Sequence, residues 1–438
     1  MPESAARMRS PREAQSDEPL ATLRPANDWR KLLLLFTLAG VVESQAFGHL
    51  SAFRPLFLQQ LGVPVAQIPF WTGLLASLGF VIGLPLLPFW GVWADRFSRK
   101  LIIVRSAYIE GVLFALAALS PNVWALAGAQ LLVGFVYGNT GVMLAMLADV
   151  TPRRRLGLAV GLASAGFPIS SSVGPLIGGY VAQTLGIRVL LFSDGVASAL
   201  IGLLLTFTIY EGRHRAISEV TVMATLRQAT RDILASRLVV SVFGLYFFSV
   251  FSVSLYTQFI PILIQRLSTG PSAHLPSLIG NTLAATGIAM AITTPLWGRL
   301  GDAVGRWRTL PIILGALTLG VTAASLAPTL QPLQTAIVWN GLFQGGLGAT
   351  VVALLAVLAP EERRASILTF SLLPSQVSWF LGPLLGGALA SVSLRAPFYA
   401  GIIFQVSALA LAFILAGRVR QAQVASEHHG PAPQSLAR

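Results

Sequence analysis

One acidic residue of this chain stands where an acid is costly. Glu43 lies about twelve residues into an apolar run over residues 32 to 52, hence near mid-depth of that run at about 1.5 Å per residue. A carboxyl group among apolar side chains can bind a proton and release it when its hydration changes. The sequence therefore offers Glu43 as a proton-binding site. The alternative is a protonated glutamic acid that only bonds to a neighbouring helix.

A second feature with chemical potential is a polar loop that occurs twice between apolar runs. It reads Gly-Val-Trp-Ala-Asp-Arg-Phe-Ser-Arg-Lys over residues 91–100 and returns 207 positions later. An aspartate in such a loop can bond to a helix N-terminus or an arginine in one conformation and release it in another. The alternative is that the cations only set the topology. The motif consists of Gly91, Asp95, Arg96, Arg99 and Lys100, repeated by Gly298, Asp302 and Arg306.

The composition fixes the environment of these residues. Of the 438 residues 54% are hydrophobic and only 11% are charged, whereas soluble domains have about 25% charged residues. A helix needs about 20 apolar residues to cross the bilayer core, and the chain has twelve such runs. They lie near 32–52, 70–92, 101–119, 122–147, 157–183, 189–210, 238–263, 276–297, 309–327, 331–358, 366–391 and 397–417. The sequence predicts a polytopic membrane protein.

The net charge of +13 would suggest a nucleic-acid partner in a soluble protein, but its placement indicates otherwise. All but four of the 30 Lys and Arg residues fall in the termini or in the loops after even-numbered runs; the exceptions are Arg54, Arg188, Arg266 and Arg395. This bias predicts that both termini are cytoplasmic in a bacterial plasma membrane. The absence of cysteine excludes disulfides, thiolate metal sites and cysteine nucleophiles.

The repeat extends well beyond the polar loop. Pro88 and Trp90 return as Pro295 and Trp297, and later pairs such as Gly174 and Gly382 are offset by one further residue. Two halves that begin on the same membrane side are parallel repeats, which enclose a site near the midplane. The linker carries apolar residues at helical spacing, which predicts either an amphipathic surface helix or a simple tether. We expect a disordered tail over 1–28, six-helix bundles over 29–210 and 238–418, the linker over 211–237, and a second disordered tail over 419–438.

The polar loop resembles the motif between the second and third helices of the major facilitator superfamily, with its degenerate copy between helices eight and nine. The resemblance covers the chain from about Trp29 to Arg418. It implies an all-α fold of twelve transmembrane helices in two parallel six-helix halves. In that family the aspartate is thought to latch the halves together on the cytoplasmic side when the transporter faces outward. Carried over, Asp95 and Arg99 would be latch residues.

A proline-containing motif narrows the resemblance. Its two copies are Gly174, Pro175, Gly178 and Gly179, and Gly382, Pro383, Gly386 and Gly387. The pattern is similar to the so-called antiporter motif of drug–proton exporters in this superfamily, in which a helix bend seals the outer side against proton leak; generic helix packing is the alternative. The family's arginine of helix four is missing from residues 134–139. Proton coupling is therefore implied by the resemblance, with Glu43 as its site.

The family fold also implies a cavity lined by helices one, four, seven and ten. In this chain those helices would contribute Gln45, Tyr137, Asn139, Tyr246, Phe247, Tyr256, Gln258, Trp339, Asn340 and Gln344. Aromatic rings and amides suit an amphipathic ligand that is neutral or cationic. Simple packing of aromatic residues is the alternative.

The remaining ionisable residues are expected to be structural. We expect Glu110 to bond to helix two, and Asp194 to be solvated or paired with Arg188. Asp149 fits a cytoplasmic latch or a topology marker. For His49 and Arg54, near the outer end of helix one, we expect surface solvation or a gate.

These features predict a secondary active transporter that works by alternating access and exports amphipathic drugs in exchange for protons. A metabolite importer or proton symporter on the same scaffold is the main alternative, and a non-transporting sensor is a third. The sequence carries no nucleotide-binding loop, metal-ligand cluster or nucleophile triad, so we expect no enzymatic activity and no cofactor. The expected partners are a small-molecule substrate, protons and the lipid bilayer, and we expect a monomer.

Overall fold

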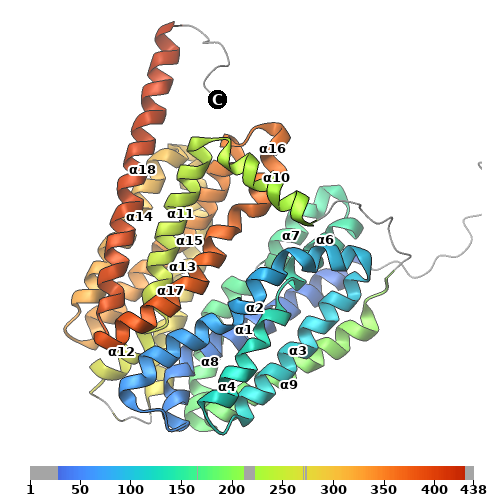
Figure 1. Cartoon of the computed structure of the whole chain (residues 1–438), viewed down its shortest axis with the longest axis vertical. Coiled ribbons are helices and arrows are strands. Elements are labelled where there is room, and N and C mark those ends of the chain that lie inside the picture. The colour runs from blue at the N-terminus through green and yellow to red at the C-terminus, as the bar shows by residue number, and fades with distance from the viewer. Residues whose placement is uncertain (1–27, 165, 212–221, 270, 272–273, 430–438) are drawn as a thin grey trace, which may run out of the picture.

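The computed structural model describes residues 28–164, 166–211, 222–269, 271 and 274–429, and the regular elements of this part are all helices. They form two bundles whose helices are inclined to one another (Figure 1). The first comprises α1 (Trp29–Gln60), η2 (Val65–Gln67), α2 (Ile68–Arg96), α3 (Arg99–Leu119), α4 (Val123–Leu131), α5 (Val133–Val136), α6 (Asn139–Val150), η3 (Arg153–Arg155), α7 (Leu156–Ser164), α8 (Gly166–Thr184) and α9 (Ile187–Thr208).

The second bundle follows the linker. It comprises α10 (Val222–Leu234), α11 (Arg237–Thr257), α12 (Ile260–Leu267), α13 (Leu275–Val304), α14 (Arg306–Leu326), α15 (Leu330–Leu358), α16 (Glu361–Thr369), η5 (Phe370–Leu372), α17 (Leu373–Val392) and α18 (Ala396–His429). Polar side chains cap several helix starts. The hydroxyl of Ser98 accepts from the Leu101 N–H, and the Asn122 amide oxygen accepts from the Ala125 N–H.

Eleven segments of the described chain are long and apolar enough to cross a bilayer. The twelfth predicted span is α17, which packs against α2 and α11. Its apolar character is diluted by Ser375, Gln376 and Ser378, and Ser378 donates its hydroxyl to helix carbonyls at 2.8 and 3.3 Å. The all-α, two-bundle architecture expected from the sequence is confirmed.

The two halves meet through two helix pairs related by the repeat, α8 with α13 and α2 with α17. Both contacts are backbone to backbone. A Cβ atom on Gly280 would lie 2.2 Å from the carbonyl oxygen of Pro175, and one on Gly73 would lie 2.2 Å from that of Pro383. Only glycine allows so close an approach.

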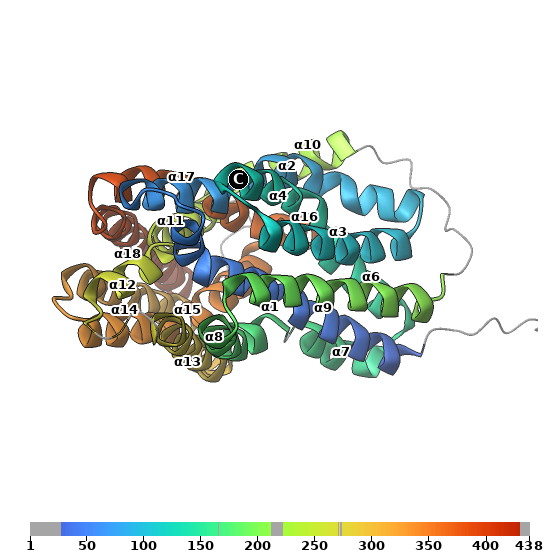
Figure 2. The same cartoon turned by 90° about the horizontal axis from the view of Figure 1, so that it is seen from below.

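Side-chain bonds join the halves at one end of the molecule. Ser51 and Arg54 of α1 donate to the amide oxygen of Gln258 at 2.9 and 3.2 Å, and Gln59 exchanges two bonds with Gln265 at 2.8 and 3.1 Å. We call this region, defined by these five residues, the closed end. Figure 2 views the molecule from this end, where α12 lies.

The two halves share one part of the apolar core, and each half has a further core of its own. One buried cluster combines Phe53 and Phe57 of the first half with Tyr256 and Ile260 of the second. The two other clusters lie within single halves, one around Leu32, Phe36, Ile103, Met143 and Leu147, and one around Val239, Leu310, Leu317, Val351 and Leu355. The halves are therefore joined by apolar packing toward the closed end, and each has its own core toward the other end.

Two boundaries bear on the expected domains. Helix α18 continues to His429, beyond residue 418, where we expected a disordered tail to begin. Residues 418–429 are rich in helix-forming side chains, and Gly430 and Pro431 follow them. The linker contains α10, which contacts α16 and pairs Asp232 with Arg363 at 3.7 Å. The tail expected over 1–28 lies outside the described residues except for Asp28, which caps α1.

Candidate functional site

Glu43 has a specific partner in helix four. The side-chain amide of Asn139 donates to Oε2 of Glu43 at 2.7 Å. Helix four is broken just before this residue: α5 ends at Val136, α6 begins at Asn139, and Gly138 has φ +95°. A Cβ on Gly138 would lie 2.4 Å from the Cβ of Trp90, so glycine is required both for the turn and for the contact. The break places Asn139 as the first residue of α6, opposite Glu43.

A cation from helix three stabilises this break. The Arg105 guanidinium donates to the carbonyl oxygen of Tyr137 at 3.0 Å and lies 3.5 Å from the centre of a Trp90 ring. From the sequence, helix four lacks the family's arginine, and Arg105 is one of the cations assigned to the loop after the second run. One signal could have singled it out. The residue at the equivalent position of the second half is the apolar Ile312, so Arg105 departs from the repeat. Glu43 departs from it in the same way, because its equivalent is Val250.

Glu43 and Asn139 line a small cavity inside the first half. Glu110 of α3 and Ser198 of α9 line the same cavity, together with apolar side chains. Glu110 is buried, and its Oε1 has no hydrogen-bond partner in the described part of the chain. We expected Glu110 to bond to helix two. Its helix instead packs mainly against α9, and this packing turns the carboxyl group toward α9 and α1.

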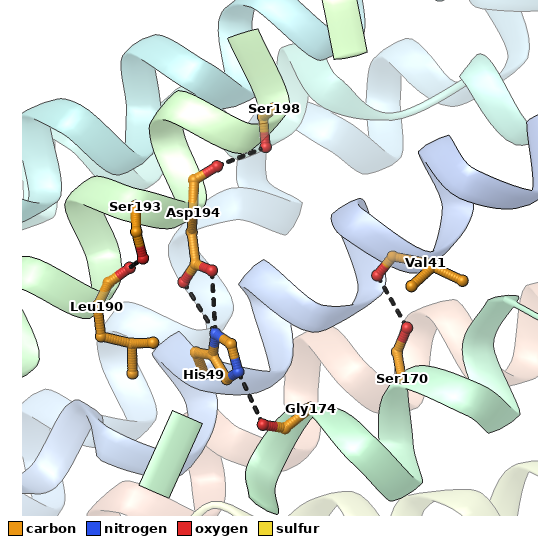
Figure 3. A network of polar contacts seen from close by, with 8 residues as sticks. All are labelled: Val41, His49, Ser170, Gly174, Leu190, Ser193, Asp194 and Ser198. Carbon is orange, nitrogen blue, oxygen red and sulfur yellow. Dashed lines mark hydrogen bonds and ion pairs between the residues drawn. The ribbon is translucent and has the colours of Figure 1, made fainter. Parts of the chain in front are cut away.

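His49 and Asp194 form a buried pair (Figure 3). Nδ1 of His49 lies 3.0 Å from both carboxylate oxygens of Asp194, and Nε2 lies 2.9 Å from the carbonyl oxygen of Gly174. We expected Asp194 to be solvated or paired with Arg188, and both alternatives were wrong, because Asp194 is buried and Arg188 donates to the carbonyl of Ala118 at 2.6 Å. The expected surface position of His49 was wrong as well, since only 2% of this residue is exposed. Both corrections have the same cause, which is the rotation of α1 and α9 about their axes.

The antiporter-like motif borders this pair. A Cβ on Gly178 would lie 2.3 Å from the His49 ring, and Gly179 faces α13 across the junction between the halves. In the second copy, a Cβ on Gly386 would lie 2.2 Å from the carbonyl of Leu255, and Gly387 faces Gly73. Both copies thus have close packing contacts, and the sealing role of the motif stays a prediction.

The polar loops contain ion pairs within each half. Arg99 bonds to Asp149 at 2.7 Å, and Arg306 bonds to Asp302 at 2.9 Å. Arg96 lies over the ring of Phe97. The surroundings of Gly91 and the side chain of Asp95 are outside the described part of the structure, so the latch assigned to Asp95 stays a prediction. Asp149 is thus bonded to the first polar loop, and its role as a latch or a topology marker stays a prediction.

The expected cavity residues do not all lie together. Gln258 belongs to the closed end, and Tyr256 stacks on Phe398 with ring centres 4.9 Å apart. Trp339 donates to the carbonyl of Ala316 in α14 at 2.8 Å, so it faces that helix. These three side chains contact partners on other helices, and the helical spacing of residues within a single span does not predict such contacts.

The other members are divided between the two bundles. Asn340 donates to the hydroxyl of Tyr256 at 3.5 Å and packs against Gly320. Tyr246 belongs to the apolar core of the second half, and Phe247 stacks on Phe251. The others are half-buried residues on helices one, four and ten, namely Gln45, Tyr137 and Gln344.

The fold and this site define a polytopic membrane protein with paired six-helix halves and buried acids within the first half. A model of the Major Facilitator Superfamily matches residues 33–275 and 242–438, so the chain belongs to this superfamily of membrane transporters. It is 27% identical to the multi-drug resistance efflux pump PmrA homolog of Lactococcus lactis over 88% of this chain and 95% of that protein. It is 29% identical to multidrug resistance protein MdtG of Dickeya zeae over 85% and 91% of the two chains.

Solved structures give the same fold. A bacterial homolog of the lysosomal transporter Spinster, in an inward-facing and occupied conformation, has a TM-score of 0.74 at 19% identity and covers 90% of this chain and 98% of that one. The nucleoside transporter NupG has a TM-score of 0.67 at 13% identity, with coverage of 88% and 99%. At these identities the likeness concerns the fold alone.

Proposed function

We propose that this protein exports amphipathic small molecules in exchange for protons, by alternating access between its two halves. The observation that carries the proposal is the bond between Glu43 and Asn139 at the break in helix four. A carboxyl group at mid-depth of a span is costly and serves a function by default. Two relatives whose names describe multidrug efflux or resistance support export of drug-like compounds.

The proposed orientation follows from the cation bias, which puts both termini in the cytoplasm. The closed end then faces outward, so the proposal takes the described conformation as the one closed toward the outside. The Asn139 amide can donate to the Glu43 carboxyl group in either protonation state, so it holds the group in place. Glu43 would take up a proton when it is accessible from outside and lose it to the cytoplasm, where substrate binding favours the ionised form.

The substrate would lie between the halves rather than beside Glu43, because the cavity at Glu43 is small and enclosed by α1, α3, α6 and α9. Phe247 and Gln344 on the second half, and Gln45 on the first, are candidate contacts. Aromatic and amide groups of this kind hold neutral or cationic amphiphiles by stacking and a few hydrogen bonds. The protein would act as a monomer in the plasma membrane, without a cofactor or an enzymatic step.

Flux of protons and substrate in proteoliposomes tests the proposal. Lipophilic cations, neutral drugs, nucleosides and sugars are screened against the native protein, Glu43→Gln and the acid-retaining Glu43→Asp. Opposed proton and drug flux that is lost in Glu43→Gln and at least partly kept in Glu43→Asp is the expected result. Parallel flux of a metabolite and protons would establish the symporter alternative, and coupling that survives Glu43→Gln would remove Glu43 from the mechanism.

A further inference from the structure

Glu110 is a buried acid that the proposed mechanism leaves without a task. It lies in the middle of α3, is 3% exposed, and its Oε1 has no hydrogen-bond partner in the described part of the chain. An unpaired carboxyl oxygen in a membrane span is strongly disfavoured unless it holds a proton or serves a function. The Glu110 carboxyl opens onto the cavity that Glu43 also lines.

Apart from the two glutamates, the side chains that line this cavity carry no charge. Asn139 of α6 and Ser198 of α9 are its other polar members, and the remaining lining residues are apolar. Asp194 lies one turn before Ser198 on α9, but its carboxylate is bonded to His49 of α1. On α3 itself, Arg105 is bonded to the carbonyl of Tyr137 and lies over Trp90, and it does not line the cavity.

Two carboxyl groups in a cavity with no cationic lining cannot both be ionised at modest cost. Their mutual repulsion is weakly screened among apolar side chains, so the two groups exchange protons as a unit. The amide of Asn139 is bonded to Glu43 and stabilises one of the two groups. The two carboxyl groups are therefore inequivalent, because Glu43 has an amide donor and Oε1 of Glu110 has no partner in the described part of the chain.

The second half provides an internal comparison. The repeat-related positions of Glu43 and Glu110 are Val250 and Leu317. Both belong to the apolar core of that half, Leu317 as a buried member and Val250 packed against it. The same place in the fold thus packs well without acids, and the first half departs from the plan at both positions together.

We infer that Glu43 and Glu110 form one two-carboxyl site that holds a single exchangeable proton between them. The inference rests on the proposed function, because it assigns a second residue to the proton site of the transporter. Glu110 is the alternate proton carrier, and its own ionisation is linked to that of Glu43. A purely structural Glu110 would stay protonated throughout and leave the titration of Glu43 unchanged.

Infrared difference spectroscopy of the purified native chain during a pH titration tests the pair directly, through the carbonyl band of protonated carboxyl groups. We expect one band to titrate in the native protein. In Glu110→Gln the midpoint should move to lower pH by about one unit, because repulsion from the second carboxylate is removed. In Glu43→Gln the remaining band should belong to Glu110, and the double variant should lose it. Glu211→Gln, in which an exposed carboxyl group is removed, should match the native protein.

Glu110→Leu guards against misfolding of the Gln variant, because Leu317 shows that leucine fits the equivalent place. An unchanged midpoint in both Glu110 variants would overturn the inference. Failure of the proposed function has a different signature, since native proteoliposomes would then lack opposed proton and drug flux while the infrared titration still reports on the pair. If transport and the effect of Glu43→Gln persist but the titration ignores Glu110, only the inference fails.

Discussion

Nδ1 of His49 lies 3.0 Å from both carboxylate oxygens of Asp194, although 145 positions separate the two residues. The other ring nitrogen faces the carbonyl oxygen of Gly174 at 2.9 Å. A carbonyl only accepts, so Nε2 carries a proton, and a further proton lies between Nδ1 and the carboxylate. Through this arrangement one imidazole ties α1 to α9 and to the antiporter-like segment of α8.

Removal of one partner of this pair should destabilise the first half. His49→Leu leaves the buried Asp194 carboxyl group without its imidazole partner, at an expected cost of about 3 kcal/mol. The double variant with Asp194→Leu should cost less than the sum of the single variants, with a coupling of about 1–3 kcal/mol. Reversible unfolding in mixed micelles measures all four proteins. Additive effects would contradict a direct interaction in the folded protein.

The break in helix four should depend on the shape of the Arg105 side chain as well as on its charge. Arg105→Lys keeps the cation but loses the planar group that lies over Trp90 and reaches the Tyr137 carbonyl. We expect a loss of about 1–2 kcal/mol of stability, near the value of a buried cation–π contact, and slower transport because Asn139 is less well placed against Glu43.

A matched control for this variant is Arg188→Lys, whose native side chain also donates to a backbone carbonyl, that of Ala118. It should leave the rate of transport near the native value. The assignment to Arg105 would be refuted by an Arg105→Lys variant with native stability and a native rate of transport.

The glycine contact between α8 and α13 should control the balance of conformations. In Gly280→Ala the new methyl group meets the Pro175 carbonyl, a backbone atom that cannot turn aside. A penalty of about 1–3 kcal/mol on the described conformation shifts the conformational equilibrium by about 5- to 150-fold. Because the chain has no cysteine, a single Ser51→Cys probe reports the opening of the closed end through its rate of thiol labelling.

Labelling of this probe should accelerate in Gly280→Ala and stay at the native rate in Gly315→Ala, where a Cβ would meet nothing within 4 Å. Equal rates in both variants would show that this contact does not set the conformational equilibrium.

A covalent link across the closed end should arrest transport. Gln59 and Gln265 face each other from the two halves through two amide hydrogen bonds of 2.8 and 3.1 Å. We expect the double variant Gln59→Cys and Gln265→Cys to transport until a short bis-maleimide joins the thiols, and then to lose nearly all flux because the halves can no longer separate there. Each single variant treated with the same reagent is the control. Continued transport by the linked protein would mean that this end need not open.

Much of the architecture was predicted from local sequence properties. The length and hydropathy of the apolar runs indicate helices that cross a bilayer. The repeat of Trp90 as Trp297 and of Pro88 as Pro295 indicates two equivalent halves. Glu43 was identified because an acid inside such a run is exceptional whatever its neighbours are. These signals need no knowledge of how one helix faces another.

The side-chain partnerships needed the tertiary structure. His49 is buried in a pair with Asp194 instead of lying at the protein surface, and Glu110 shares a cavity with Glu43. Both arrangements depend on the rotation of each helix about its axis, which decides which face of a span meets which neighbour. In the sequence, nothing distinguishes Gly138 from many other glycines of the chain. Only the structure shows that Gly138, with φ +95°, separates the end of one helix from the start of the next, beside Arg105. The sequence alone thus determined which segments are helices and how they correspond between the two halves, because a bilayer requires long apolar spans. Only packing between distant helices decided which polar groups meet inside the first half, because in a hydrocarbon environment each must find its partner within the protein.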